Sequence, residues 1–106
     1  MSDESLVRYL LDQLDDEEVS ARRMFGGHGI YRDGRMFALV YGGKTYMKVT
    51  KAEEETSDRP SFSPPSGQTF RSFREVYADE LEDREALNRL AAAAVAAARS
   101  AVDRRS

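Results

Sequence analysis

The 106-residue chain contains no cysteine, and this absence removes several functional classes at once. It leaves no disulfide, no thiol nucleophile and no thiolate ligand for a metal. Imidazole chemistry is nearly as scarce, because His28 is the only histidine and a metal site would need several further ligands converging on it. We therefore expect no metal and no cofactor.

The sequence also lacks a long apolar run and a basic start. No stretch approaches the roughly 20 consecutive apolar residues that a membrane-spanning helix needs. Asp3 and Glu4 make the beginning acidic, whereas a secretory signal begins with basic residues. We expect a cytoplasmic protein that does not associate with membranes.

The residues that are present describe one globular domain. Hydrophobic residues make up 41% of the chain and charged residues 33%, and the length suits a single domain over residues 1–106 with a modest core. The charge is uneven, because residues 22–51 hold seven bases and one acid, whereas residues 1–21 hold seven acids and one base. Such asymmetry indicates either a contact surface for an anionic partner or pairing of basic strands with the acidic segments around them.

Apolar periodicity and turn residues predict the secondary structure. Leucine spacing predicts a helix over residues 4–14, with Ser2 or Asp3 as its N-cap. Asp83 is a suitable N-cap for a long C-terminal helix, whose alanines allow close approach to a sheet. Five predicted strands lie between the helices, over residues 19–25, 28–32, 35–41, 44–50 and 69–74.

Two acidic segments are expected to be solvated. Residues 15–18 form a link into the first strand, because carboxylates are unfavourable at a helix C-terminus. Residues 52–67, rich in Glu, Ser, Asp and Pro, are predicted to form a long surface loop that Phe62 anchors to the core. Neither segment has the ligand spacing of a calcium loop.

Tight turns at Asp33-Gly34 and Gly42-Gly43 set the predicted register and sort the side chains between two faces. The first turn predicts the cross-strand pairs Arg32–Arg35, Ile30–Phe37 and His28–Leu39. The uncharged face carries Tyr31, Met36, Ala38, Val40, Thr45, Met47 and Val49. The basic-aromatic face carries His28, Ile30, Arg32, Arg35, Phe37, Leu39, Tyr41, Lys44, Tyr46 and Lys48. We predict an α+β domain, an antiparallel meander sheet of four to five strands with the N-terminal and long C-terminal helices packed on the uncharged face.

No residue pattern indicates catalysis. The glycines around His28 are followed by no helix and match neither a dinucleotide fingerprint nor a P-loop, so a bend in a strand is the favoured interpretation. His28 has no Ser, Asp or Glu at a suggestive spacing. We expect a non-enzymatic protein, with a small-substrate hydrolase using His28 as the runner-up.

The basic-aromatic face is the candidate interaction surface. Its residues are Arg32, Arg35, Phe37, Tyr41, Lys44, Tyr46 and Lys48. A protein partner, or self-association into a homodimer, would cover the aromatic side chains. Direct nucleic-acid binding is the alternative, with cations on phosphates and rings on bases. An ordinary exposed sheet face is the third interpretation.

Several spaced elements together resemble one known family. They are Arg22-Arg23-Met24-Phe25-Gly26-Gly27-His28-Gly29-Ile30-Tyr31, then Asp33-Gly34, Met36-Phe37-Ala38-Leu39-Val40 and Tyr46-Met47-Lys48-Val49. This pattern resembles the N-terminal domain of the TfoX/Sxy proteins. The resemblance implies an α+β fold and a role in competence or transcription regulation, and it supplies no catalytic residues. It covers nearly the whole chain, so we expect a stand-alone, single-domain member.

Overall fold

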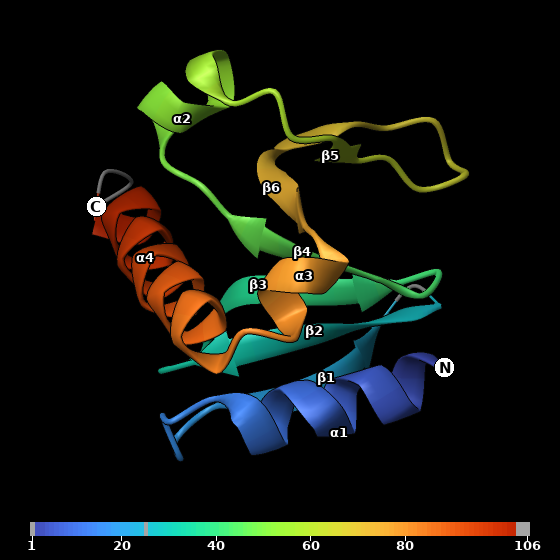
Figure 1. The fold of residues 1–106 in the computed structure, drawn as a ribbon. Coiled ribbons are helices and arrows are strands. Elements are labelled where there is room, and N and C mark those ends of the chain that lie inside the picture. Colours follow the sequence, from blue (N-terminus) through green and yellow to red (C-terminus); the bar gives the residue numbers. More distant parts are fainter. Residues whose placement is uncertain (1, 25, 104–106) are drawn as a thin grey trace.

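A computed structural model describes residues 2–24 and 26–103 (Figure 1). The helices are α1 (Asp3–Gln13), α2 (Lys51–Thr56), α3 (Ala78–Leu81) and α4 (Arg84–Asp103). The strands are β1 (Ser20–Met24), β2 (Gly27–Arg32), β3 (Arg35–Tyr41), β4 (Lys44–Lys48), β5 (Ser61–Phe62) and β6 (Phe70–Val76). Phe25, the last residue of the first predicted strand, lies outside the described residues.

The strands form one antiparallel sheet in the order β1-β2-β3-β4-β6-β5. The first four follow one another as the predicted meander, and β6 then pairs with β4. The α+β prediction is confirmed. The sheet has six strands rather than four or five, because the short strand β5 lies within the segment predicted to be a loop.

Both long helices contribute to one apolar core with the sheet. Leu10 of α1 and Leu87 of α4 are fully buried, as are Ala38 and Val40 of β3. The face of α4 toward this core is largely alanine, which lets the helix lie close to β3 and β4 as expected. This confirms that the two helices share one face of the sheet. None of the described helices has the length and apolar character needed to cross a membrane.

Local capping explains where the long helices begin. The Ser2 hydroxyl accepts a hydrogen bond from the Ser5 N–H at 3.1 Å, and the Asp83 carboxylate accepts one from the Ala86 N–H at 3.1 Å. Asp3 has a different role, since its carboxylate accepts the N–H groups of Gly42 and Gly43 at 3.2 and 2.7 Å. The start of α1 is thereby attached to the turn between β3 and β4.

A β-bulge in β3 overturns part of the predicted register. Arg32 pairs with Arg35 as predicted, but the next pairs are Tyr31–Met36 and then Ile30–Ala38, so Phe37 is an extra residue. A bulge directs two consecutive side chains toward the same side. Phe37 and Ala38 are both buried in the helix-side core. The predicted pairs Ile30–Phe37 and His28–Leu39 are therefore wrong, because the strand slips by one residue.

The bulge exchanges residues between the predicted faces. Ile30 and Phe37, each 1% exposed, belong to the helix-side core rather than the basic-aromatic face. Tyr31 and Met36 lie on the other side, where the Tyr31 hydroxyl donates to the Met24 sulfur at 3.4 Å. Beyond the bulge, the predicted assignment to the helix side is confirmed for Ala38, Val40 and Met47, which pack in the helix-side core. The burial of Thr45 agrees with its predicted place on the same side.

The segment predicted as a long loop is more ordered than expected. Thr50 and Glu53 form a capping box that starts α2, so the fourth strand ends at Lys48. Phe62 packs in a second apolar cluster, which confirms its anchoring role. The acidic run at residues 53–55 thus belongs to a short helix instead of a loop.

Arg74 of β6 ties this segment to the sheet. Its side chain is buried, with 6% exposure, and its guanidinium donates to the carbonyl oxygens of four residues. These are Glu54 at 2.6 Å, Arg71 at 2.8 Å, Ser57 at 2.9 Å and Arg59 at 3.0 Å. A single cation therefore satisfies carbonyls at the end of α2 and in the link to β5.

Candidate functional site

A second apolar cluster lies on the side of the sheet opposite the long helices. We call this side the helix-free face. Leu39, Tyr46 and Phe73 form the buried centre of the cluster. The partly buried residues around them are Met36, Tyr41, Phe62 and Phe70. The face is therefore apolar at its centre although neither α1 nor α4 covers it.

Phe62 holds the aromatic part of this cluster together. Its ring centroid lies 5.5 Å from that of Tyr41, 5.2 Å from that of Tyr46 and 5.6 Å from that of Phe70. These distances are typical of favourable aromatic pairs. The strand β5 places the ring there by pairing Phe62 directly with Phe70 of β6.

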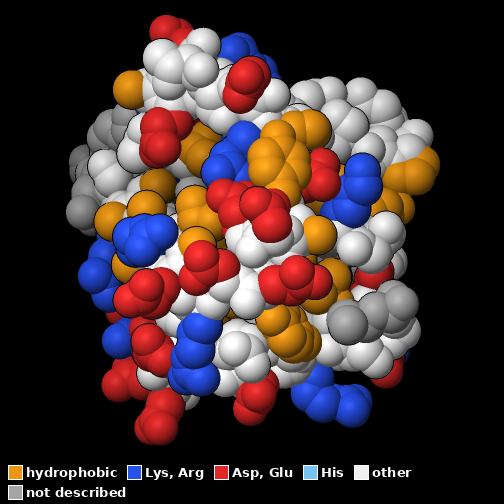
Figure 2. Space-filling model, viewed as in Figure 1, with side chains coloured by type: hydrophobic (Ala, Val, Ile, Leu, Met, Phe, Trp, Pro, Cys, Tyr) orange, Lys and Arg blue, Asp and Glu red, His pale blue; other side chains and the backbone are white. Residues whose placement is uncertain are grey.

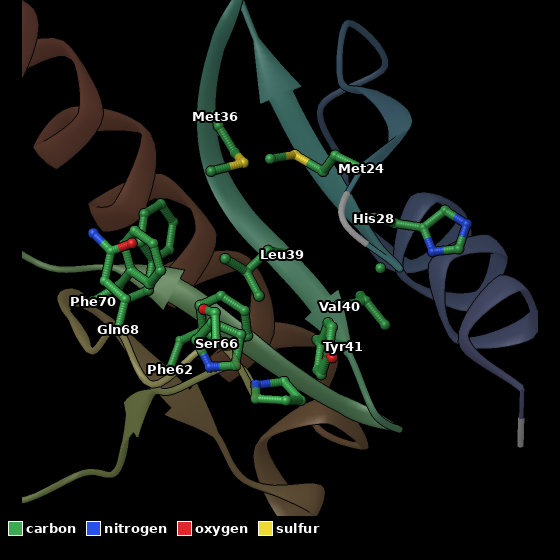
Figure 3. Close-up of a pocket in the computed structure, with 14 residues that line it drawn as sticks. Met24, His28, Met36, Leu39, Val40, Tyr41, Phe62, Ser66, Gln68 and Phe70 are labelled. Carbon is green, nitrogen blue, oxygen red and sulfur yellow. The ribbon is translucent and has the colours of Figure 1, made fainter.

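A cavity of about 620 Å³ opens beside these rings. Met24 and Met36 line one side and point toward each other, while Phe62 and Phe70 line another (Figure 3). Ser66 and Gln68, from the loop of residues 63–69 between β5 and β6, complete the lining shown there. The described residues that line the cavity include no Asp, Glu, Lys or Arg.

Missing side chains at two glycines make room for the cavity wall. A Cβ atom at Gly29 would lie 2.8 Å from the sulfur atoms of both Met24 and Met36. One at Gly27 would lie 2.5 Å from the Val40 carbonyl oxygen and 2.9 Å from the Tyr41 ring. The glycines around His28 therefore allow large side chains to lie over the backbone of β2. They do not form a phosphate cradle in this arrangement.

His28 borders the cavity but its ring lies on the other side of the sheet. The residue pairs with Val40, whose side chain is in the helix-side core, and the ring points toward α1 (Figure 3). Its Nδ1 atom is buried and has no hydrogen-bond partner among the described residues. Ser66 lines the cavity on the helix-free face, so the sheet separates the hydroxyl from the imidazole. This geometry gives no support to the runner-up hydrolase.

Arg32 forms ion pairs with nearby carboxylates of the same chain and is therefore less available to a partner. Its guanidinium lies 2.7 Å from Asp16, 3.2 Å from Glu18 and 2.5 Å from Asp33. The Glu18 N–H and the Arg32 guanidinium hold the pKa of Asp16 below its ordinary value. Arg35 shares this end of the hairpin as the cross-strand partner of Arg32. The basic strands thus pair partly with the acidic link, as one of the sequence-based interpretations held.

The structure divides the seven residues of the candidate interaction surface. Phe37 is buried on the helix side, so its assignment to an exposed face is wrong. Tyr41, Tyr46 and Lys48 are on the helix-free face, where the Lys48 ammonium lies 5.1 Å from the Phe73 ring centroid. Burial raises the pKa of the Tyr46 hydroxyl. Lys44, the cross-strand partner of Tyr41, is at the rim, 58% exposed and 3.8 Å from Glu75.

Charged side chains of both signs are present on the face of the molecule that carries α1 and α3. Figure 2 shows acidic and basic groups interspersed in the view that includes α1 and α3, with no broad patch of one sign. The described residues contain no group of three or more His, Asp or Glu side chains placed to hold a metal ion. Among the described residues, the cavity on the helix-free face is therefore the candidate binding site.

Sequence reasoning missed most of the cavity lining. Met24, Phe62 and Phe70 come from separate segments, which the β1–β4 meander and the β5–β6 pairing bring to one face of the sheet. The available signal was the pair of aromatic residues flanking a short loop with Pro64 and Pro65.

The chain matches the family model of the TfoX N-terminal domain over residues 10–98. No curated protein matches the chain. The matched range begins within α1 and ends within α4, so it includes the complete sheet and the cavity.

Proposed function

The chain belongs to the TfoX N-terminal domain family, and from this premise we propose that it is a non-enzymatic regulatory module that binds a protein partner in the cytoplasm. The family supports a TfoX-like regulatory role in general. A part in competence or transcription regulation is our extension of that role to this chain. The lack of cysteine favours the cytoplasm.

The observation that carries this proposal is the helix-free face. An apolar centre with aromatic rings and a charged rim is typical of surfaces that bind partners. Here the partly buried rings of Tyr41 and Phe62 surround the buried centre, and the rim includes the exposed Lys44. The described side chains of this face include no nucleophile and base in contact, which supports binding rather than catalysis.

A different protein is favoured over a second copy of this chain. Self-association would pair rim cations with acidic groups such as those at residues 15–18. Asp15 already contacts Arg84 at 2.9 Å, and Asp16 already contacts Arg32 at 2.7 Å within the same chain. These contacts leave less acidic charge for another copy.

Direct nucleic-acid binding is the weaker alternative, because carboxylates of the same chain already pair with part of the basic charge that it would need. Arg32 faces carboxylates, and the seven candidate residues do not form one continuous surface. Nucleic-acid binding predicts an affinity that falls steeply with salt, because counterions are released from the phosphates. Titration of labelled DNA and RNA at two salt concentrations tests it, and a salt-sensitive complex weakened by Arg32→Glu would replace our proposal with this alternative.

Matched charge reversals test the regulatory role and the face that performs it. In a host strain lacking this gene, we expect the wild-type chain and the Arg8→Glu variant to restore the transcript profile. We expect Lys44→Glu to fail, because it makes the same charge change at the rim of the helix-free face, whereas Arg8 is an exposed residue of α1. Circular dichroism of both variants checks that they are folded.

Two results would contradict the proposal. An unchanged transcript profile after gene deletion would remove the regulatory role. Full restoration by Lys44→Glu, or equal failure of Arg8→Glu, would remove the helix-free face as the partner surface.

A further inference from the structure

We propose that the cavity on the helix-free face binds a small, electrically neutral molecule. Comparison of its volume with the volumes of known apolar cavities indicates a molecule of about two or three rings. An apolar cavity of roughly 150 Å³ is enough for benzene, and small-molecule pockets range from roughly 300 to 1,000 Å³. The volume here is about 620 Å³. This inference goes beyond the regulatory role and needs no partner protein, so either can fail while the other stands.

The lining selects against charge. Its described residues include no Asp, Glu, Lys or Arg, and the ring of His28 points toward α1 on the other side of the sheet. The polar side chains of the lining on this face are Tyr41, Ser66 and Gln68. A charged group moved into such surroundings loses its hydration without gaining a counter-charge. The molecule is therefore neutral, with one or two hydrogen-bonding groups directed at the loop.

The two walls differ in stiffness, which favours rings. Phe62 and Phe70 stack with an interplanar angle of 25°, and Tyr41 meets Phe62 at 64°. These rings support one another and offer both faces and edges to an aromatic guest. Met24 and Met36 form the opposing wall, and thioether side chains adapt to irregular shapes.

The size of the lining favours a small molecule over a protein segment. A stable protein–protein interface buries roughly 800 Å² on each partner. A compact cavity of about 620 Å³ has a wall of only roughly 350 Å², the surface of a sphere of that volume, which is too little for such an interface. A partner protein can still contact the rim at Lys44 while the cavity holds its own ligand.

A neutral fluorescent probe measures binding directly. N-phenyl-1-naphthylamine becomes fluorescent in apolar surroundings, and we expect saturable binding of one molecule per chain with a dissociation constant on the order of 10–100 µM. The sulfonated analogue 1-anilinonaphthalene-8-sulfonate is the charged control, and we expect it to bind at least ten-fold more weakly. No saturable binding, or equal binding of the anion, overturns the proposal.

Methyl NMR of the wild-type chain locates the probe without any variant. Signals from ¹³C-methyl methionine should shift for Met24 and Met36, which line the cavity. The signal of Met47 should not shift, because it is buried in the helix-side core. Equal shifts at Met47, or shifts at neither cavity methionine, overturn the assignment.

A filled cavity provides the matched test. Met36→Trp replaces a flexible thioether with a larger indole side chain inside the cavity and should weaken probe binding at least ten-fold. The control Ala93→Trp adds the same side chain at an exposed position of α4 and should leave binding unchanged. The chain has no other tryptophan, so each variant also reports its own surroundings by fluorescence. If light scattering shows a dimer that Met36→Trp dissociates, and the wild type binds no probe, the occupant is a second copy and the proposal is wrong. If Met36→Trp does not fold, the NMR result decides.

Discussion

Replacing Arg74 with methionine tests whether one buried cation holds α2 and the link into β5. The guanidinium donates to four carbonyl oxygens at 2.6–3.0 Å, and no described carboxylate forms an ion pair with it. Methionine fills a similar volume but donates none of these bonds. The affected carbonyls belong to residues 54–59 and to Arg71.

The magnitude follows from two opposing contributions. Hydrogen bonds to a charged group stabilise by about 1.5–3 kcal/mol each, whereas burial of the guanidinium costs several kcal/mol that methionine does not incur. We expect a net loss of about 3 kcal/mol in the free energy of unfolding, and a fall in Tm on the order of 12–15 °C for a domain of this length.

Urea and thermal unfolding give the overall effect, and hydrogen exchange shows where it acts. The Ser57 and Glu75 amides, which donate to Glu53 and Pro60, should exchange faster in Arg74→Met. The control is Arg71→Met, because Arg71 is exposed and its guanidinium donates to the Glu54 carbonyl oxygen at 3.3 Å. We expect that control to change the unfolding free energy by about 0.5 kcal/mol or less. A loss under about 1 kcal/mol for Arg74→Met, or faster exchange spread evenly over the sheet, would refute the reasoning.

Three further substitutions have defined outcomes. Thr45→Val should raise the free energy of unfolding by about 1 kcal/mol in urea titrations, because the buried Thr45 hydroxyl has no hydrogen-bond partner among the described residues; a loss of stability would show that the hydroxyl is satisfied. Glu80→Gln should destabilise by about 1 kcal/mol at pH 7 but not at strongly acidic pH. The Arg59 guanidinium, 2.6 Å away, lowers the pKa of Glu80 in the folded state, so this stabilisation is present above the ordinary glutamate pKa and disappears as pH falls through the lowered value; a pH-independent difference would contradict it. Phe37→Ala should cost about 4 kcal/mol in the same assay and clearly more than Met36→Ala, because Phe37 is 1% exposed in the main core; the reverse order would restore the unbulged register.

Elements with local signals were predictable from the sequence. Capping residues and leucine spacing identified both long helices, and the Asp33-Gly34 turn placed the Arg32–Arg35 pair correctly. These features depend on residues close together in the chain, so short-range patterns contain the necessary information.

Elements that depend on distant contacts were not predictable in the same way. Phe37 is apolar and aromatic, so it is equally acceptable on either face, and only packing against both helices decides in favour of the bulge. The acidic α2 has no apolar stripe, and its order depends on a capping box and on Arg74 from another strand. The cavity likewise requires β5 to pair with β6, and the aromatic residues on either side of the loop with Pro64 and Pro65 do not by themselves specify that pairing.

The helix-side core and the cavity lie on opposite faces of one sheet, so the positions that tolerate amino-acid changes are separate from those that do not. The helix-side core requires side chains from both long helices. One part of the cavity lining, in contrast, comes from a single loop, residues 63–69. Doubling the length of a flexible loop costs only about 0.6 kcal/mol. Insertions or randomised residues in this loop should therefore yield many folded variants that admit molecules of different size.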